Sequence, residues 1–394
     1  MNSQANPKHF FRESDVSLDQ LKVVPPESMG ICTDRWNRVL RKAQEICLSG
    51  KLPALSIQVQ RKGKTTGVHH FGTASLSHPV PVTDQHLFLV ASLTKPILAM
   101  ATMSLVEKGE LILNDRVSRF FPQMTDPAKK PITIRHLLSH TSGLPDMLPN
   151  NQELRQANAP LDEFVEQSCR TELLFPPGRS AQYQSMGYAL LGAILEKITG
   201  TSCREFLEKE ILLPLGMSQT QLGIEYGSGD EDWIAEIDLA EPQRSGTGWN
   251  WNSRYWRELG APWGGILSTA ADLSRFLQMM LQKPSDGVGR GPVSQASIVA
   301  AVENRLHDFP AIPEADRRSR GWGLGWRLNW NDHRTTYSDL LPAEAVGHWG
   351  ATGTLFWIDR SRQIGAVLLT TRPLDENPSP LTALSNMILA SFVE

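Results

Sequence analysis

Long apolar runs, targeting signals and paired cysteines are all missing from this sequence of 394 residues. It contains no stretch of 18 or more apolar residues, so it predicts no membrane-spanning helix. Its N-terminus, MNSQANPKHFFRESDVSLDQ, lacks the apolar core of a secretory signal and contains acids that transit peptides avoid. We therefore expect a cytoplasmic protein. Its scattered cysteines form no C-x-x-C pair, which favours free thiols in a reducing compartment: Cys32, Cys47, Cys169 and Cys203.

The chain also has no strong excess of charge of either sign. Lysine and arginine number 39 against 42 aspartates and glutamates, which gives a formal net charge of −3. A nucleic acid or an anionic membrane would need a basic protein surface, so we expect neither partner. Hydrophobic residues make up 40% of the chain, enough for a large core. The length predicts two or three lobes, or one large domain with an insertion.

Several common enzyme signatures are absent. No G-x-S-x-G occurs, which leaves no candidate for a nucleophile elbow. His136 and His140 are four residues apart, but no H-E-x-x-H glutamate accompanies them, so a structural role for this pair is favoured over zinc binding. There is no Walker A lysine and no G-x-G-x-x-G after a predicted strand. We therefore expect neither a metal ion nor an organic cofactor.

The periodicity of the apolar residues indicates how the chain is organised. Residues 1–30 are polar and predict a loosely held leader. Residues 31–110 and 321–394 predict a lobe of helices and strands, and residues 111–320 predict a largely helical lobe. Alternation with period two predicts strands over 55–60, 68–72, 323–330, 354–358 and 364–371. Helical spacing predicts helices over 34–49, 93–106, 132–139, 188–199, 203–211, 271–281 and 381–392. The pattern indicates an α+β fold whose α/β layer comes from both ends of the chain.

One serine has a lysine at a spacing that suggests nucleophilic catalysis. Ser92 and Lys95 form an S-x-x-K pair at the start of the helix predicted over 93–106. On a helix, the lysine lies one turn beyond the serine on the same face, so its amine can reach the hydroxyl. To act as a base it must be neutral, which requires its pKa to fall from about 10.4 to about 7–8. The positive potential of the helix N-terminus favours that fall. Alone the pair is a weak signal, because a surface serine and a solvated lysine can share this spacing.

Two further elements follow in a meaningful order. Tyr183-Gln184-Ser185 precedes an apolar helix, and Gly347-His348-Trp349-Gly350 precedes an alternating strand. With the S-x-x-K pair, they resemble the three motifs of the serine β-lactamases, penicillin-binding proteins and their esterase relatives: S-x-x-K, then Y-x-N or S-x-N, then K-T-G or H-x-G. The phrases TIRHLLSHTSGLP (133–145), FPPG (175–178) and GGILSTAADL (264–273) are also similar to this superfamily. The resemblance covers about residues 30–392 and is nearest to class C β-lactamases and family VIII carboxylesterases.

The resemblance implies a fold and a set of catalytic roles. It implies an α/β lobe with an antiparallel sheet flanked by helices, an all-helical lobe, and a site in the cleft between them. Ser92 matches the acylated nucleophile, Lys95 its partner, and Tyr183 the tyrosine that passes protons. The phenol pKa of Tyr183, normally about 10, must fall, or the phenol must act in concert with the lysine. The backbone N–H groups of Ser92 and Ala351 match the oxyanion hole, and His348 is expected among the catalytic residues.

Two departures from the superfamily pattern bear on the substrate. Ser185 replaces the usual asparagine, and a hydroxyl has one donor where an amide group has two. His348 replaces a lysine and gives only a fractional positive charge at pH 7, which weakens its hold on a substrate carboxylate. Both departures favour neutral esters over acidic amides. From the resemblance we also expect four residues to line the substrate site: Ser185, Trp349, Gly350 and Trp263.

A tryptophan-rich stretch allows two interpretations. Its indoles could form an apolar wall or lid over the substrate, or simply the edge of the core. Arg254 and Arg257 in the same stretch could hold a carboxylate, although solvated loop arginines are more common. The tryptophans are Trp249, Trp251, Trp256 and Trp263.

These observations together predict a serine hydrolase that works through an acyl-enzyme. We expect a carboxylesterase for small-molecule esters of short to medium acyl chain, with weak β-lactamase activity as a side reaction. Three alternatives use the same site: a peptidase or amidase for D-amino-acid peptides, a β-lactamase, and an acyltransferase with an acceptor other than water. A catalytically silent scaffold on this fold is a further alternative, which the serine, lysine and tyrosine argue against. The oligomeric state stays open.

Overall fold

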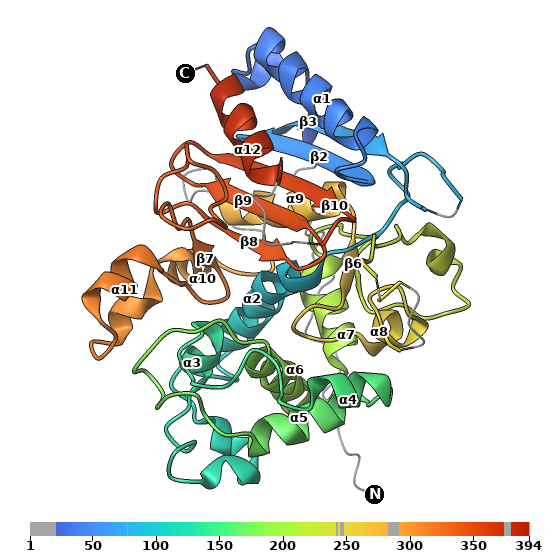
Figure 1. The fold of residues 1–394 in the computed structure, drawn as a ribbon. Coiled ribbons are helices and arrows are strands. Elements are labelled where there is room, and N and C mark those ends of the chain that lie inside the picture. Colours follow the sequence, from blue (N-terminus) through green and yellow to red (C-terminus); the bar gives the residue numbers. More distant parts are fainter. Residues whose placement is uncertain are drawn as a thin grey trace, which may run out of the picture.

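The fold combines a mixed β-sheet covered by helices on both faces with a second, helical region (Figure 1). The computed structural model describes residues 21–76, 78–241, 243–244, 248–282, 291–373 and 380–393. The helices are α1 (Thr33–Leu48), α2 (Thr94–Glu107), α3 (Ile134–Leu138), α4 (Asn151–Gln156), α5 (Leu161–Arg170), α6 (Met186–Thr199), α7 (Cys203–Leu207), α8 (Arg254–Leu259), α9 (Ala270–Leu281), α10 (Gln295–Val302), α11 (Glu314–Ser319) and α12 (Pro380–Ser391). The strands are β1 (Lys22–Val23), β2 (Ala54–Arg61), β3 (Lys64–Gly72), β4 (Phe88–Leu89), β5 (Gln221–Leu222), β6 (Ile266–Ser268), β7 (Arg327–Leu328), β8 (Val346–Gly350), β9 (Thr354–Asp359) and β10 (Ile364–Thr370).

The main sheet joins the two ends of the chain. Its strand order is β1-β3-β2-β10-β9-β8-β7, and every neighbouring pair is antiparallel except β1 and β3. The central contact pairs β2 with β10, so that Ile57 lies opposite Leu368. Because β10 is buried along its whole length, the sheet is covered on both sides. The α+β fold predicted from both ends of the chain is confirmed.

The two faces of the sheet belong to different cores. Alternate residues of β2 and β10 face a core that contains helices α1 and α12, which pack against each other. Helix α9 packs on the opposite face, against β2 and β10 (Figure 1). There Gln60 of β2 donates a hydrogen bond to the Ser274 carbonyl of α9 (3.1 Å). The amide N–H group of Gln60 therefore bonds within the protein, and the buried Gln60 does not mark a solvent surface.

Helices α2 and α6 form the centre of the helical region. They contact each other, and α6 also contacts α3, α5 and α7. Twelve of the residues of α2, from Thr94 to Leu105, are buried in succession. A helix that is buried all round has no polar stripe, and the few polar residues of α2, such as Lys95 and Thr102, are buried with the apolar ones.

A small second sheet fixes the start of α2. Its order is β4-β6-β5, with both pairs antiparallel. Val90, which follows β4, donates its N–H to the Ile266 carbonyl of β6 (2.9 Å). This bond holds the segment that leads into the S-x-x-K pair against β6. Gly264 and Gly265 directly precede β6.

Several sequence expectations need correction or comment. The described part of the leader is held in place: Lys22–Val23 pairs with β3, and Met29 is buried. The strand predicted over 323–330 forms only at Arg327–Leu328. Helix α9 packs on the sheet although it lies within 111–320, the stretch expected to be the helical lobe. Residues 1–20 of the leader lie outside the described residues.

Three further findings concern the cysteines, membrane-spanning helices and metal-binding groups. All four cysteines are free, as the sequence predicts. Among the described residues, none of the helices has the length and apolar character needed to cross a membrane. The same residues include no group of three or more histidine, cysteine or acidic side chains arranged to hold a metal ion.

Candidate active site

Ser92 lies on a tight turn at the entrance to α2. The turn is a 3-10 helix, Ala91–Leu93, that runs directly into α2. Ala91 has a φ of 48°, in the left-handed region that residues other than glycine seldom adopt. The Thr94 hydroxyl donates a hydrogen bond to the Ala91 carbonyl (2.7 Å) and helps hold this backbone. Ser92 is partly exposed between buried neighbours, so its hydroxyl is presented to the outside from a rigid base.

Lys95 is fully buried and its amine reaches Ser92. The lysine Nζ lies 3.1 Å from the Ser92 Oγ and donates a second hydrogen bond to the Trp263 carbonyl (2.7 Å). Burial lowers the pKa of Lys95 to about 7, against the opposing influence of the Asp146 carboxylate. At pH 7 a large fraction of this amine is therefore neutral and has a lone pair for the serine proton. The base that the S-x-x-K spacing requires is available.

Tyr183 contacts the same hydroxyl from another element. Its OH donates a hydrogen bond to the Ser92 Oγ (2.7 Å), and its ring centre is 4.7 Å from the Lys95 Nζ. Removal of solvent from the phenol raises the pKa of Tyr183, and the charge of Asp146 adds to this effect. A raised pKa excludes the phenolate alternative of the sequence analysis at neutral pH. It favours a neutral phenol that passes protons in concert with Lys95.

Aromatic neighbours hold the Tyr183 ring in place. The His140 ring lies 4.9 Å from it and the Trp322 ring 5.8 Å, centre to centre. The His140 Nδ1 accepts a hydrogen bond from the Gln184 N–H (3.1 Å), which fixes the residue after the tyrosine. His136 caps α3 through Thr133. Both histidines of the pair therefore have structural contacts, the role that the sequence analysis favoured for them.

Ser185 is engaged by a carboxylate that the sequence analysis did not identify. Its hydroxyl donates to Asp146 Oδ1 (2.6 Å), and its N–H donates to the Asp146 carbonyl (3.2 Å). Ser185 is buried and directly precedes α6. With its single donor committed, it has no second donor for Lys95 or for a substrate amide. Asp146 follows the TIRHLLSHTSGLP phrase by one residue, but nothing in its spacing connects it with Ser185.

The third motif ends beside the nucleophile. Thr354 donates its hydroxyl to the Val90 carbonyl (2.8 Å), and Thr352 donates to the Leu89 carbonyl (2.5 Å). A side chain on Gly350 would collide with the Val90 carbonyl. These contacts bring the end of β8 against the segment that precedes Ser92. Ala351, whose N–H the sequence analysis expects in the oxyanion hole, directly follows β8 and is exposed.

His348 lies in the site but is uncharged at neutral pH. Its ring is 5.8 Å from the Tyr183 ring and 6.0 Å from the Trp322 ring. Its Nδ1 donates to the Trp349 carbonyl (2.7 Å), and its Nε2 is buried with no partner among the described residues. Burial and the nearby Lys95 lower the pKa of His348 to about 3. The prediction from the sequence that His348 has a fractional positive charge at pH 7 is therefore wrong.

The two tryptophans expected to line the substrate site turn their indoles into the protein. Trp349 packs in the core on the α1 and α12 side, and its indole donates to the Thr335 carbonyl (2.7 Å). The Trp263 side chain is 2% exposed and packs against Phe164 and Trp256. Trp263 reaches the catalytic group through its carbonyl, which holds Lys95.

Comparison with known proteins agrees with this geometry. The model of the family described as Beta-lactamase matches residues 36–385. A "Putative D-alanyl-D-alanine carboxypeptidase" of Salmonella typhimurium is 29% identical over 330 residues, which are 77% of this chain and 73% of that protein.

Two solved structures share the fold. "EstCE1, a hydrolase with promiscuous acyltransferase activity" superposes with a TM-score of 0.74 at 18% identity, covering 90% of this chain and 98% of that one. A family VIII carboxylesterase gives a TM-score of 0.71 at 18% identity, covering 92% and 98%. At these identities the likeness concerns the fold.

Proposed function

Because the chain belongs to the beta-lactamase family and is a serine hydrolase of that fold, we propose that it is a carboxylesterase acting through an acyl-enzyme on Ser92. Its substrates are esters of short to medium acyl chain. The observation that supports this proposal is the pair of hydrogen-bonding contacts on one hydroxyl: the Ser92 Oγ lies 3.1 Å from a buried amine and 2.7 Å from a phenol. A nucleophile within reach of a base and a proton relay is the arrangement that acyl transfer requires.

Acylation follows from these contacts. Neutral Lys95 takes the proton of Ser92 as the Oγ attacks the ester carbonyl. The carbonyl oxygen becomes an oxyanion that the N–H groups of Ser92 and Ala351 stabilise, each worth roughly 3–4 kcal/mol. The bond to the alkoxide leaving group then breaks, and the Tyr183 OH gives the alkoxide a proton while it regains one from Lys95. The alcohol leaves, and the acyl group stays on Ser92.

Deacylation reverses the proton path with water as the nucleophile. Tyr183 and Lys95 together accept a proton as water attacks the acyl carbonyl, and Ser92 leaves with a proton returned to its oxygen. Because the raised pKa of Tyr183 keeps the phenol protonated, it conducts a proton without ever being the resting base. Lys95, with a pKa of about 7, accepts a proton and then returns it in each half-reaction.

Two features of the site support an ester over an acidic amide. An uncharged His348 provides no cation for a substrate carboxylate at the third motif. Ser185 has its only donor on Asp146 and cannot bind an amide carbonyl. An ester has a better leaving group than an amide and depends less on such contacts.

A peptidase for D-alanyl peptides is the second candidate. The 29% identity to the Salmonella typhimurium protein supports it, because that identity extends over most of both chains. The acylation half-reaction is the same for both candidates, so the choice depends on the groups that bind the rest of the substrate.

The test compares kcat/KM for p-nitrophenyl butyrate, a chromogenic cephalosporin and a peptide ending in D-Ala-D-Ala. We expect the ester to be the best substrate. A cephalosporin or peptide preferred by about 10²-fold, or roughly 2.7 kcal/mol in barrier, contradicts the proposal. Ser92→Ala is the control, and a fluorophosphonate must label the wild-type protein only. If no Ser92-dependent label forms, the chain is a scaffold on a hydrolase fold.

A further inference from the structure

A buried arginine packs against two indoles that also contact each other, with their ring centres 5.6 Å apart. Arg155 belongs to α4 and is 5% exposed. Its guanidinium carbon is 4.2 Å from the ring centre of Trp249 and 4.4 Å from that of Trp256. The rings belong to the tryptophan-rich stretch whose role the sequence left open, and they shield the guanidinium from solvent. Such cation–π contacts stabilise the charge of the guanidinium but leave its N–H groups without hydrogen-bond acceptors.

The guanidinium has almost no polar partner. Its Nη2 contacts the Met147 sulfur (3.4 Å), which is a weak acceptor, and its Nε is buried with no partner in the described part of the chain. None of the ion pairs among the described residues includes Arg155. Burial lowers the pKa of Arg155 to about 10, so the group is still cationic at pH 7. A buried cation without a hydrogen-bonded anion is costly, and binding an anion would reduce that cost.

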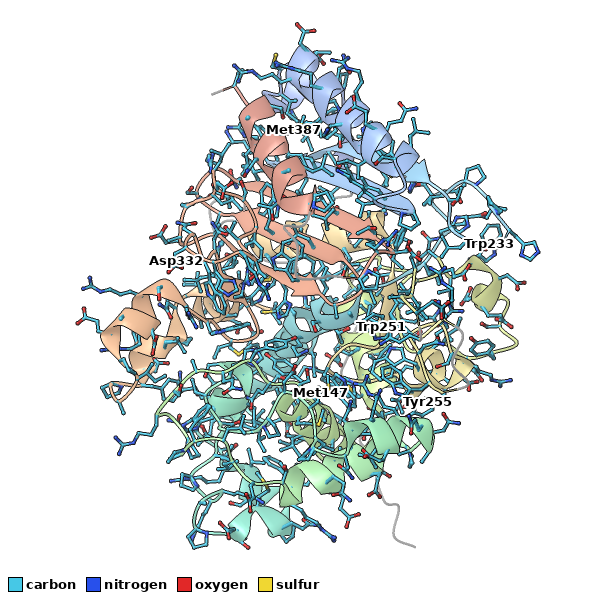
Figure 2. All side chains as sticks on the ribbon, in the orientation of Figure 1. Met147, Trp233, Trp251, Tyr255, Asp332 and Met387 are labelled. Atoms are coloured by element: carbon cyan, nitrogen blue, oxygen red, sulfur yellow. The ribbon has the colours of Figure 1, made fainter. Side chains whose placement is uncertain are left out.

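The surroundings of Arg155 connect it with the catalytic site on two sides. Met147 follows Asp146, whose carboxylate holds Ser185 and influences the pKa of Lys95 and of Arg155. On the other side, the Trp256 ring packs 6.3 Å from the Trp263 ring, and the Trp263 carbonyl holds Lys95. Figure 2 labels Met147, Trp251 and Tyr255 in this part of the molecule.

The other arginines of the region each have an oxygen partner, although the Nε of Arg257 has none among the described residues. Arg254 pairs with Glu258 (2.9 Å) on the surface, and Arg257 donates to Asn252 (3.2 Å). These were the carboxylate-binding candidates from the sequence. The structure instead points to Arg155 in the polar segment NQELRQ, whose composition is typical of a solvated helix.

We propose that Arg155 binds a carboxylate of the ester substrate, so that the enzyme prefers esters with a free acid group. The indoles contact the guanidinium but accept no hydrogen bond from it, and its parallel N–H groups suit a planar carboxylate. The acid group can belong to the acyl part or to the alcohol part. This inference rests on the proposed esterase function and names its substrate class.

The test uses matched ester pairs with and without a carboxylate. The acyl arm compares p-nitrophenyl hemisuccinate with p-nitrophenyl butyrate, and the leaving-group arm compares 4-acetoxybenzoate with phenyl acetate. In at least one arm, Arg155→Met should lower kcat/KM for the acid ester by about 10- to 100-fold, mainly through KM. The neutral ester should change by less than about threefold. Arg254→Met is the control and should leave the ratio of kcat/KM between the acid and the neutral ester unchanged in both arms. The proposal is overturned if Arg155→Met leaves the ratio of kcat/KM for the acid ester to kcat/KM for the neutral ester unchanged in both arms.

A second measurement needs no variant. Benzoate and benzamide compete with p-nitrophenyl butyrate for the wild-type enzyme, and their binding is also followed by tryptophan fluorescence. Benzoate should bind at least about tenfold more tightly than benzamide. Equal binding overturns the inference even if Arg155→Met does not fold. A protein that hydrolyses neutral esters without any acid preference refutes only the inference. A protein that hydrolyses no ester refutes the proposed function, and fluorescence still decides whether a carboxylate binds.

Discussion

The fold buries the Lys95 amine, and no acid among the described residues forms an ion pair with it. Its pKa falls to about 7, and only the neutral form can accept the Ser92 proton. We therefore predict that kcat/KM for p-nitrophenyl butyrate rises with pH, with an apparent pKa near 7, and reaches a plateau above it. The measurement is a pH–rate profile between pH 5 and 9.

A substitution separates Lys95 from other titrating groups. Arginine keeps the charge but does not deprotonate in this range, so Lys95→Arg should lose at least about 10²-fold in kcat/KM at pH 8. A wild-type profile that is flat from pH 6 to 8 would show that another group is the base. His348 does not complicate this range, because burial keeps its pKa near 3.

Asp146 provides a second prediction at the residue scale. Its carboxylate raises the pKa of Lys95 against the effect of burial. Asp146→Asn removes that charge, so the pKa of Lys95 should fall further and the acidic limb of the profile should move to lower pH. Ser185→Ala is the matched control, because it removes the hydrogen bond but leaves the charge. A limb that stays in place in Asp146→Asn, or moves to higher pH, contradicts this account.

The sequence predicts the reacting residues better than the residues that surround them. Ser92, Lys95 and Tyr183 occupy motif positions, and the structure brings their polar atoms together. Asp146 and Arg155 act through contacts between segments far apart in the chain, and neither has a local pattern. Their roles depend on burial and on neighbouring charge, which become visible only after folding.

Among the elements, long periodic segments are predictable and short non-local ones are not. Helical spacing predicts α1, α2, α6, α9 and α12 to within about two residues. Strand β8, with its glycines and histidine, has no clear alternation, and β4 has only two residues. These two elements exist because β9 and β6 pair with them. They also flank Ser92 and Ala351, whose N–H groups we propose for the oxyanion hole, so the least predictable elements lie next to the proposed site.

Gly350 tests this dependence on β8. An added Cβ would collide with the Val90 carbonyl and the Thr354 hydroxyl. We predict that Gly350→Ala pushes the end of β8 away from the nucleophile and lowers kcat by about 10²-fold, with a stability loss of about 1–3 kcal/mol. The measurements are steady-state kinetics and urea unfolding. Gly264→Ala is the control, since its Cβ would be 3.6 Å or more from Ala91 and should have little effect. Equal activities in the two variants would contradict the prediction.

At the scale of the whole molecule, the sheet separates stability from catalysis. Ser92 lies beside the core that contains α2, α6 and α9. The other core, with α1 and α12, lies across the sheet and is closed by strands from both ends of the chain. A change confined to this second core should weaken the whole fold while the contacts of the catalytic hydroxyl persist.

Leu368 is the residue to test this separation. It is fully buried in the second core, and its strand pairs it with Ile57 and Leu355 on either side. Leu368→Ala should lower the free energy of unfolding by about 2–5 kcal/mol, because it removes buried apolar surface and leaves a cavity. Leu48 is 80% exposed at the end of α1, so Leu48→Ala should change that free energy by less than about 0.5 kcal/mol. Urea unfolding measures both, and kcat/KM well below the unfolding transition should equal the wild-type value in each. A loss of kcat/KM in Leu368→Ala without a loss of stability would show that the two faces of the sheet are coupled at the catalytic hydroxyl.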